Sequence, residues 1–485
     1  MSLVLHIHPV YSEYHSDAYI GSVRLLKHQV KTLEAFQDPD VDVIFNTAMT
    51  GDGKSLAAYL PTFQDHHKHV IAMYPTNELV RDQFSALARY KQDLRVRLPQ
   101  YETMYSDKIT QLMREHDTSI RLGEVRKLLM RNGILLTNPD LIHLMMSHQY
   151  GWSHLRKELP FAIGANFDYF LFDEFHVFGV PQVISVMNML GYLTVNYRDK
   201  LPAERKKFVF LSATPSKLMD NLLERGGLRY RRIEGSYRSS EHPDFRCILQ
   251  ACTLELHEVS SEAPVERWIE DRLEEIHSFF KQYPNSKAAI LVNSVATARR
   301  LVTRLRAYFE PYYGPNFIGE NTGLTSQEEK QKSYEAQILV GTSTVDVGVD
   351  FHINYLIFEA SNSGSFLQRF GRLGRHDEFD IYQAYALVPR FVLERLTKNV
   401  EHGNEVEREA FNKAIQSAFP TEQQFEQYTK LWGVVQAAQV IVELQKQNKM
   451  DENTAFTEAL IEQYDRFYGT AEKLAMPGAL KKYRR

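Results

Sequence analysis

The sequence has few cysteines and no long apolar run. Only two of its 485 residues are cysteines, Cys247 and Cys252, which excludes a disulfide scaffold and is typical of a reducing, cytoplasmic environment. No run approaches the ~18 consecutive apolar residues of a membrane span. The first residues lack the basic start and apolar segment of a secretory signal. We therefore expect a soluble cytoplasmic protein that does not enter a membrane.

The sequence also lacks a large excess of charge of either sign. Its 57 Lys and Arg residues oppose 61 Asp and Glu residues, which gives a net charge of −4. A globally basic nucleic-acid binder is excluded, so nucleic-acid contact would need a local patch. Residues 197–238 are a candidate patch because they contain 11 Lys and Arg against 5 Asp and Glu. A solvated face and a binding surface are both open interpretations of this run.

Short β-prone apolar runs alternate with longer amphipathic stretches along most of the chain. This pattern predicts an α/β fold in which parallel sheets are covered by helices. A first set of expected strands comprises residues 41–46, 69–74, 133–137, 169–172 and 208–211. A second set comprises residues 288–293, 337–341, 355–358 and 384–388, and residues 248–257 are expected to open the second domain as a strand.

The length and these patterns predict three regions. At roughly 100–200 residues per domain, 485 residues correspond to two to four domains. Residues 226–244 are rich in Gly, Ser, Arg and His and have no sustained periodicity, so we place a boundary near residue 240. Beyond about residue 391 the strands stop and helical patterns follow. The expected organisation is 1–240 and 241–390 as α/β domains, with 391–485 as a helical C-terminal domain.

The segment from Ala48 to Ser55, AMTGDGKS, has the spacing of a phosphate-binding loop and follows the first expected strand. Its glycines allow successive backbone N–H groups to point at phosphate oxygens. Ala48 stands where the usual pattern has glycine. Lys54 is expected to be exposed and to reach the β- and γ-phosphates, while the Ser55 hydroxyl would ligate Mg²⁺. The residues predicted to line the nucleotide are Thr50, Gly51, Asp52, Gly53, Lys54 and Ser55.

An acidic pair follows another expected strand, 119 residues after Lys54, in the sequence FDEFH. Asp173 is predicted to hold Mg²⁺, because a carboxylate oxygen is a hard ligand. Glu174 is predicted to orient or deprotonate the attacking water. An isolated acidic pair at a strand end is usually a solvated turn, but together with the phosphate-binding loop it indicates an ATPase that uses ATP and Mg²⁺.

Further motifs follow in the order found in superfamily 2 helicases of the DExH type, which the sequence resembles from about residue 25 to 375. The resemblance implies two tandem RecA-like domains. It is based on Asp173–His176 and on these motifs: Gln29 in LLKHQ, Tyr74–Asn77, Thr137–Asp140, Ser212–Thr214, Val292–Ser294, Gly341–Asp350 and Gln368–Arg375.

The resemblance implies a role for each motif. Gln29 would bind the adenine edge, and Asp350 would contact the ribose or couple the domains. Arg372 and Arg375, which follow Gln368 in the same catalytic motif, would approach the γ-phosphate. His176, Ser212 and Thr214 would couple hydrolysis to domain movement. Single-stranded nucleic acid would be held without base readout by Pro75, Thr76, Asn77, Thr137, Asn138, Asn293, Ser294, Thr342 and Thr344.

The phosphate-binding loop, the FDEFHVF segment and the closing QRFGRLGR most resemble the stand-alone helicase subunit of type I CRISPR systems, especially type I-D. This resemblance implies action on a DNA strand displaced by a guide-RNA effector complex, together with an HD nuclease. The preference for DNA over RNA depends on the resemblance alone. Two alternatives stay open: an RNA helicase of the same superfamily, and an ATP-gated nucleic-acid clamp or assembly factor that does not unwind.

Three histidine-containing segments could imitate metal sites. An HD nuclease needs a histidine, a His-Asp pair and a further aspartate, and only 24 residues precede Leu25. The dipeptides His116-Asp117 and His376-Asp377 lie inside the helicase-like region, and we interpret both as polar turn or helix residues. Residues 64–69, QDHHKH, are interpreted as a solvated loop. The nuclease is therefore expected on a partner chain.

Overall fold

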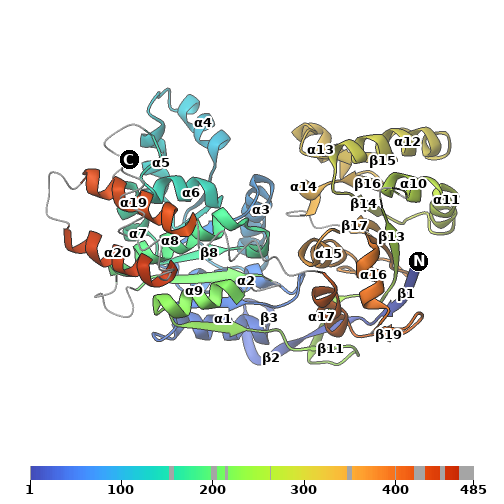
Figure 1. Ribbon diagram of the computed structural model, residues 1–485, viewed down its shortest axis with the longest axis horizontal. Helices are drawn as coiled ribbons and strands as arrows, with labels where there is room; N and C mark the ends of the chain where they lie inside the picture. Colours follow the sequence, from blue (N-terminus) through green and yellow to red (C-terminus); the bar gives the residue numbers. More distant parts are fainter. Residues whose placement is uncertain are drawn as a thin grey trace. The chain divides into compact units, whose positions relative to one another are not determined.

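The structure of the chain is a computed structural model (Figure 1). It describes residues 2–151, 158–197, 205–212, 217–260, 262, 264–346, 352–398, 400–419, 432–447 and 454–468. The chain forms two compact units. Unit 1 contains Met1–Ser16, Thr50–Asp52 and Ser236–Thr421, and unit 2 contains Asp17–Met49, Gly53–Gly235 and Glu422–Arg485.

Unit 2 is built on a seven-stranded sheet in which every neighbouring pair is parallel. Its strands are short, and the central ones are buried on both faces, as their unbroken apolar sequences predict. The spatial order is β10 (Tyr230–Ile233), β4 (Val43–Asn46), β9 (Lys207–Leu211), β8 (Tyr169–Phe172), β5 (Val70–Met73), β7 (Ile134–Thr137) and β6 (Tyr101–Met104). All five strands expected in the first half of the chain are present in this sheet.

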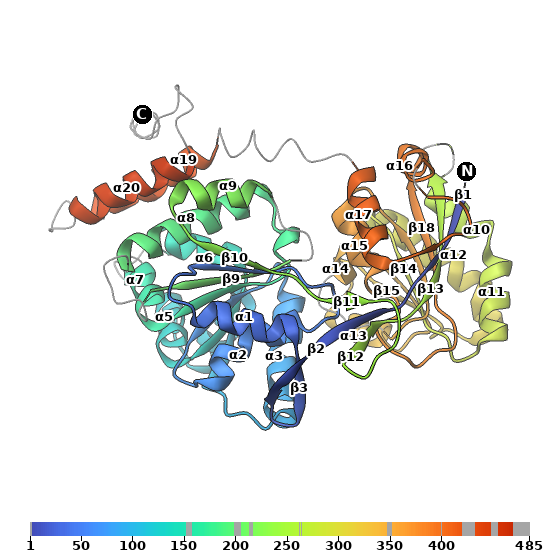
Figure 2. The same ribbon diagram turned by 90° about the horizontal axis from the view of Figure 1, so that it is seen from below.

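Helices cover both faces of this sheet (Figure 2). Phe170 and Phe172 of β8 join the core beneath one layer, while the hydroxyl of Tyr169 contacts Thr62 Oγ1 on the other side at 2.7 Å. The second side carries α1 (Lys27–Gln37), α2 (Lys54–Gln64) and α3 (Asn77–Asp93). The first carries α4 (Ser106–Glu115), α5 (Arg121–Arg131), α6 (Pro139–Met146), α7 (Leu159–Asn166), α8 (Val180–Tyr197) and α9 (Lys217–Gly226).

Two C-terminal helices, α19 (Val434–Gln447) and α20 (Thr454–Tyr468), complete the same core (Figure 1, red beside green). The Tyr464 hydroxyl donates to the Asn188 carbonyl oxygen on α8 at 2.9 Å, and Gln463 Nε2 donates to the Gly226 carbonyl oxygen at 2.8 Å. The helices were expected from the sequence, but the structure joins them to unit 2. The helices nearer residue 391 belong to unit 1.

Unit 1 contains an eight-stranded sheet that is parallel from its first strand to β13. The order is β15 (Ile318–Asn321), β16 (Ile338–Gly341), β14 (Ala288–Leu291), β17 (Tyr355–Glu359), β18 (Gln383–Pro389), β13 (Cys252–Val259), β1 (Ser2–Ile7) and β19 (Glu405–Val406). One core lies under α10 (Val265–Glu270), α11 (Leu273–Gln282) and α12 (Val295–Tyr313). The other lies under α15 (Ser363–Phe370), α16 (Arg390–Leu396) and α17 (Arg408–Ala418), and the short helices α13 (Gln327–Ser333) and α14 (Ser343–Asp346) follow β15 and β16.

The N-terminal strand β1 lies in unit 1, whereas the sequence analysis assigned residues 1–240 to the first domain. β1 pairs antiparallel with β13, and its alternate residues Leu3, Leu5 and Ile7 are buried. This burial explains the placement, because β1 covers an edge of the sheet that would otherwise expose backbone groups.

A separate small sheet contains β2 (Val10–Ile20), β3 (Val23–Leu26), β11 (Tyr237–Arg238) and β12 (Phe245–Leu249).

The strand expected over residues 248–257 is split in two, because β12 ends at Leu249 and β13 begins at Cys252. Between them, the Gln250 amide donates to the Gly374 carbonyl oxygen at 2.7 Å. Within the described residues, every helix is too short or too polar to span a bilayer.

Candidate active site

A buried hydrogen-bond network fixes the start of the AMTGDGKS loop where β4 ends. Asn46 Nδ2 donates to Thr32 Oγ1 at 2.9 Å and lies 3.0 Å from His28 Nδ1, both on α1. Asn46 Oδ1 accepts from the Ala48 amide at 3.1 Å. All three polar side chains are almost fully buried, and buried polar groups are costly unless they are paired. The network therefore sets the direction in which the chain leaves the sheet.

Gly53 provides the turn from the loop into α2. Its φ of 78° lies in the left-handed region, and a Cβ here would meet Gln29 Nε2 at 2.7 Å. Gln29 Nε2 donates to the Gly53 carbonyl oxygen at 3.1 Å, and its Oε1 accepts from the Leu26 amide at 2.9 Å. The predicted adenine-binding residue thus links the start of α1 to the phosphate-binding loop. Adenine contact itself stays a prediction.

Lys54 is buried, with 7% of its surface exposed, and the expectation of an exposed lysine was wrong. Its Nζ donates to the carbonyl oxygens of Ala48 at 2.8 Å and Met49 at 2.9 Å. The loop curls around the ammonium group because these carbonyls replace part of its water shell. Asp52, which stands two positions before Lys54 in the loop, is fully buried. Its Oδ2 accepts a hydrogen bond from the Tyr237 hydroxyl at 2.8 Å. Thr50 is half-buried and Gly51 is exposed.

Ser55 and Asp173, which were predicted from the sequence to ligate Mg²⁺, meet at the carboxyl end of β8. The Ser55 hydroxyl donates to Asp173 Oδ2 at 3.1 Å, and the Glu174 amide donates to Asp173 Oδ1 at 2.8 Å. Burial, with the adjacent Glu174 carboxylate, raises the pKa of Asp173 to about 7, although Lys54 opposes this shift. A hydroxyl and a desolvated carboxylate are hard oxygen ligands whose burial a divalent cation would offset. These residues fit Mg²⁺.

Glu174 has a left-handed backbone, with φ 48° and ψ 42°. This conformation is uncommon for a residue other than glycine and often marks a functional turn. It directs the side chain toward His176, whose Nδ1 lies 3.5 Å from Glu174 Oε2. Burial lowers the pKa of His176, which favours a neutral ring. Glu174 and Asp173 therefore have different surroundings although they are adjacent in sequence.

The remaining predicted coupling and nucleotide residues are only partly described. Ser212 follows β9, is buried, and its amide donates to the Asn46 carbonyl oxygen at 3.2 Å. It therefore lies beside the strand that begins the phosphate-binding loop. Thr214 and Asp350 lie outside the described residues, as does the side chain of Thr344.

Two predicted nucleic-acid motifs of unit 2 meet through a pair of asparagines. Asn138 Nδ2 donates to Asn77 Oδ1 at 3.1 Å, and Asn138 Oδ1 caps α6 by accepting from the Leu141 amide. Thr76 caps α3, and Pro75 before it is half-buried. Thr137 differs, because it is fully buried and donates to the Met104 carbonyl oxygen at 2.6 Å. Its side chain supports the sheet and is not a surface contact.

In unit 1, Asn293 and Ser294 are exposed after β14, and Ser294 caps α12. Asn293 Oδ1 accepts from Arg369 Nη1 at 2.9 Å, and the same nitrogen donates to the Glu359 carbonyl oxygen at 2.5 Å. Arg369 is 2% exposed and was not singled out by the sequence analysis, although it lies within QRFGRLGR. It ties this motif to the predicted nucleic-acid loop. Thr342 is buried, so its side chain is a poor surface contact.

The predicted catalytic residues Gln368, Arg372 and Arg375 lie at and after the C-terminal end of α15. Gln368 and Arg372 are buried, and Arg375 is half-buried, with its Nε donating to the Gly371 carbonyl oxygen at 2.9 Å. Arg408, which the sequence analysis missed, donates from Nη2 to the Phe370 carbonyl oxygen at 2.9 Å. No motif marks Arg408, because it lies 38 residues further along the chain.

Part of the basic run 197–238 is engaged in contacts within the chain. Arg229 pairs with Asp40 and Asp42, and Arg231 pairs with Asp38. Arg232 pairs with Asp220, and Lys207 Nζ donates to the Asp38 and Val41 carbonyl oxygens. These contacts favour a paired surface over a phosphate-binding patch.

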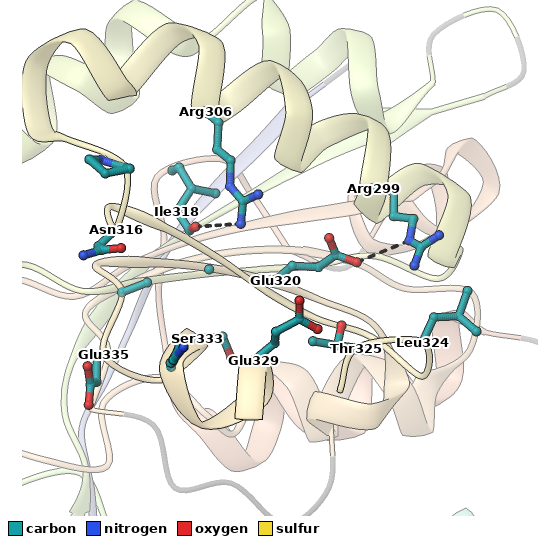
Figure 3. A pocket seen from close by; sticks show the side chains of 14 residues that line it. Arg299, Arg306, Asn316, Ile318, Glu320, Leu324, Thr325, Glu329, Ser333 and Glu335 are labelled. Carbon is teal, nitrogen blue, oxygen red and sulfur yellow. Dashed lines mark hydrogen bonds and ion pairs between the residues drawn. The ribbon is translucent and has the colours of Figure 1, made fainter. Parts of the chain in front are cut away.

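A cavity of about 770 Å³ lies at edge strand β15, between α12 and α13 (Figure 3). Arg299 of α12 lies 3.5 Å from Glu320 of β15, and Arg306 donates to the Ile318 carbonyl oxygen at 3.4 Å. The lining contains three basic and three acidic side chains (Arg299, Arg306, Lys332, Glu320, Glu329 and Glu335). Because basic and acidic side chains are equal in number, the lining favours neither an anion nor a cation. None of the predicted site residues lines the cavity.

Two family models match the chain. Residues 26–222 match the DEAD/DEAH box helicase model, and residues 284–378 match the C-terminal model of the CRISPR-associated nuclease/helicase Cas3. These regions contain the phosphate-binding loop with the DEFH segment and the QRFGRLGR motif, respectively. No curated protein matches the chain.

Several solved helicase structures share the fold. The DUF1998 helicase MrfA bound to DNA is 16% identical, with a TM-score of 0.61 over 91% of this chain and 56% of MrfA. Lhr of Mycobacterium smegmatis, bound to ssDNA and AMP-PNP, is 16% identical, with a TM-score of 0.57 over 91% of this chain and 53% of Lhr. The DEAD-box helicase Mss116 bound to ssRNA and UDP-BeF is 15% identical, with a TM-score of 0.53 over 93% and 88%.

This chain spans little more than half the length of MrfA and Lhr. At these identities the likeness establishes the fold, and it confirms the predicted α/β class with RecA-like parallel sheets. The two family models add a likeness for each matched part. Residues 26–222 are similar to DEAD/DEAH box helicase domains, and residues 284–378 are similar to the C-terminal domain of Cas3.

Proposed function

We propose that this chain is an ATP-dependent nucleic-acid translocase or helicase that acts on single-stranded DNA. The observation that carries the proposal is the convergence of Lys54, Ser55, Asp173 and Glu174 at one sheet edge, within a region that matches DEAD/DEAH box helicases. The residues come from two segments more than a hundred positions apart. Together they supply the lysine ammonium group and the hard oxygen ligands that a magnesium–nucleotide complex requires.

Each of these side chains has a distinct part in the proposed reaction. Lys54 would exchange its two carbonyl partners for phosphate oxygens, and Ser55 and Asp173 would hold Mg²⁺. The cation would neutralise phosphate charge when bound. Glu174, on its left-handed turn, would orient the attacking water and accept a proton from it. Arg375, and with it Arg372, would contribute transition-state charge stabilisation.

We further propose that the helicase serves a type I CRISPR interference system, of the type I-D kind, with a guide-RNA effector complex and an HD nuclease on another chain. The Cas3-like match of residues 284–378 and the sequence resemblance support this assignment. MrfA is bound to DNA and Lhr to single-stranded DNA in the similar structures, which is compatible with a DNA substrate.

The deciding experiment is ATPase activity measured side by side with single-stranded DNA, single-stranded RNA and duplex DNA. We expect single-stranded DNA to stimulate turnover most. Strand displacement from tailed duplexes, with Glu174→Gln as the matched inactive control, then tests unwinding. Turnover that no nucleic acid stimulates would refute the translocase assignment.

One observation favours the alternative of an RNA helicase. The RNA-bound DEAD-box helicase Mss116 shares the fold over 88% of its length, more than either DNA-bound neighbour. An RNA helicase predicts that RNA, and not DNA, stimulates turnover in the same assay. ATP-dependent nucleic-acid binding without strand displacement would indicate the clamp or assembly factor.

A further inference from the structure

Two histidines and a glutamate from separate segments of unit 1 come together beside the QRFGRLGR motif. His352 precedes β17, whereas His376 and Glu378 follow the motif. The rings of His352 and His376 stack with centroids 3.7 Å apart and an angle of 9° between their planes. His352 Nδ1 lies 2.8 Å from Glu378 Oε1. One donor atom from each residue lies within 4.8 Å of the other two.

We propose that His352, His376 and Glu378 form a binding site for a divalent transition-metal ion of the zinc class. Two imidazoles and one carboxylate are a known zinc ligand set that leaves a fourth position for water. Bonds of about 2.0–2.2 Å hold tetrahedral ligands roughly 3.3 Å apart. Donor atoms within 4.8 Å of one another therefore need only a modest rearrangement, in which the 2.8 Å contact between His352 and Glu378 is exchanged for bonds to the ion. Stacked rings must tilt to aim two nitrogens at one ion, and the exposed His352 and Glu378 have room to turn.

A second histidine cluster in the chain, Asp65, His66 and His67, shows why this one is selected. Those residues are consecutive, so their closeness follows from the chain itself. Asp65 Oδ1 already accepts from the His67 amide at 3.0 Å in a local turn. In the proposed site, His352 and His376 are 24 positions apart and are brought together by the fold. The Tyr382 hydroxyl also contacts the His376 carbonyl oxygen, which holds the backbone of that segment in place.

A bound ion would connect the residues entering β17 to the segment directly after Arg375. Because two distant parts of one unit would share a ligand, binding should stabilise the folded state. This metal proposal does not depend on the proposed helicase function, because the binding experiment needs neither nucleotide nor nucleic acid.

The test is a titration of the chelator-treated full chain with Zn²⁺ by calorimetry, and with Co²⁺ by visible absorption. We expect one site with micromolar affinity, a rise in melting temperature, and a Co²⁺ spectrum of a four- or five-coordinate ion. His352→Ala and Glu378→Gln should each weaken binding at least tenfold, because each removes one of three ligands.

The matched control is the double variant His66→Ala/His67→Ala, which removes the other histidine cluster. It should keep the site and the Co²⁺ spectrum. The proposal is overturned if the control loses Zn²⁺ binding, or if His352→Ala and Glu378→Gln both retain it. It is also overturned if the wild-type chain binds no equivalent of Zn²⁺ at 100 μM. That concentration is about ten- to hundredfold above the expected dissociation constant. Melting curves in the absence of metal verify that the two ligand variants fold.

Discussion

At the residue scale, the buried carboxylate of Asp173 couples stability to pH. Burial raises its pKa to about 7 in the folded chain, from an ordinary value of 3.8 for an aspartate side chain. Between these two pH values the folded state holds a proton that the unfolded chain releases. The contribution of Asp173 to the free energy of unfolding is therefore fully present below about pH 4 and is lost as the pH rises to 7. Asp173→Asn removes this loss. Without nucleotide or divalent cation, we expect the variant to be more stable than wild type at pH 8 by roughly 1–4 kcal/mol.

Urea unfolding at pH 5 and pH 8 measures this difference. The advantage of Asp173→Asn should shrink toward pH 5, and added Mg²⁺ should stabilise wild type but not the variant. Asp93→Asn, at an exposed position at the end of α3, is the control for removing a carboxylate that is not buried. A variant equally stable to wild type at both pH values would contradict the inferred burial penalty.

Lys54 should be essential for turnover but not for folding. In Lys54→Ala the ammonium group is lost, and with it the contact proposed for the β- and γ-phosphates. We expect ATPase activity to fall by about 10²–10⁴-fold, the scale of losing one such electrostatic group. Because Lys54 is buried against two carbonyl oxygens, we also expect a lower melting temperature, unlike for an exposed lysine. Steady-state hydrolysis and thermal unfolding of the same preparation separate the two effects, and activity above a tenth of wild type would refute the phosphate-contact role.

At the element scale, Arg408 of α17 holds the end of α15 that precedes the predicted catalytic arginines. Its guanidinium carbon lies 3.5 Å from the ring centroid of Phe370, and Nη2 donates to the Phe370 carbonyl oxygen. Burial lowers the pKa of Arg408 to about 10. Arg408→Ala leaves a cavity and an unmatched carbonyl, so we expect a loss of about 2–4 kcal/mol in the free energy of unfolding. Arg408→Lys should recover only part, because it lacks the planar fork.

Denaturant midpoints of these variants measure the effect. Arg390→Ala on neighbouring α16 is the matched control, since Arg390 is an exposed partner of Glu394 and surface pairs contribute little. A midpoint for Arg408→Ala that equals that of Arg390→Ala would contradict the positioning role.

The elements recognised from sequence were those with strong local signals. Unbroken apolar runs such as Tyr169–Phe172 are typical of strands buried on both faces, and the glycine spacing of the phosphate-binding loop has a direct physical cause. The placement of β1 was missed because its partner, β13, is about 250 positions away, and pairing at that distance has no local signature. Arg408 was missed for the same reason, because its partner, the Phe370 carbonyl oxygen, lies 38 positions away. The burial of Lys54 was missed although its carbonyl partners belong to the same loop, because the motif does not show how the loop curls around the ammonium group.

At the scale of the whole molecule, the C-terminal helices show how far sequence alone can reach. Their helical periodicity was correctly predicted, yet their place on α8 depends on Tyr464 and Tyr468 reaching Asn188. Those contacts make the tail part of the core of unit 2. The domain boundaries at 240 and 391 stay predictions, although the contacts divide the chain in a different way.

We expect that this chain does not cut DNA by itself. An HD nuclease needs a histidine, a His-Asp pair and a further aspartate around its metal ions. Among the described residues, the two clusters able to hold a metal are Asp65–His67 and the group of His352, His376 and Glu378, and neither has that set. His116 instead contacts Glu124 at 2.8 Å. We expect no cleavage of single-stranded DNA with ATP, Mg²⁺ and either Mn²⁺ or Ni²⁺. Cleavage that disappears in His116→Ala or His376→Ala would mean that the nuclease resides in this chain and not on a partner.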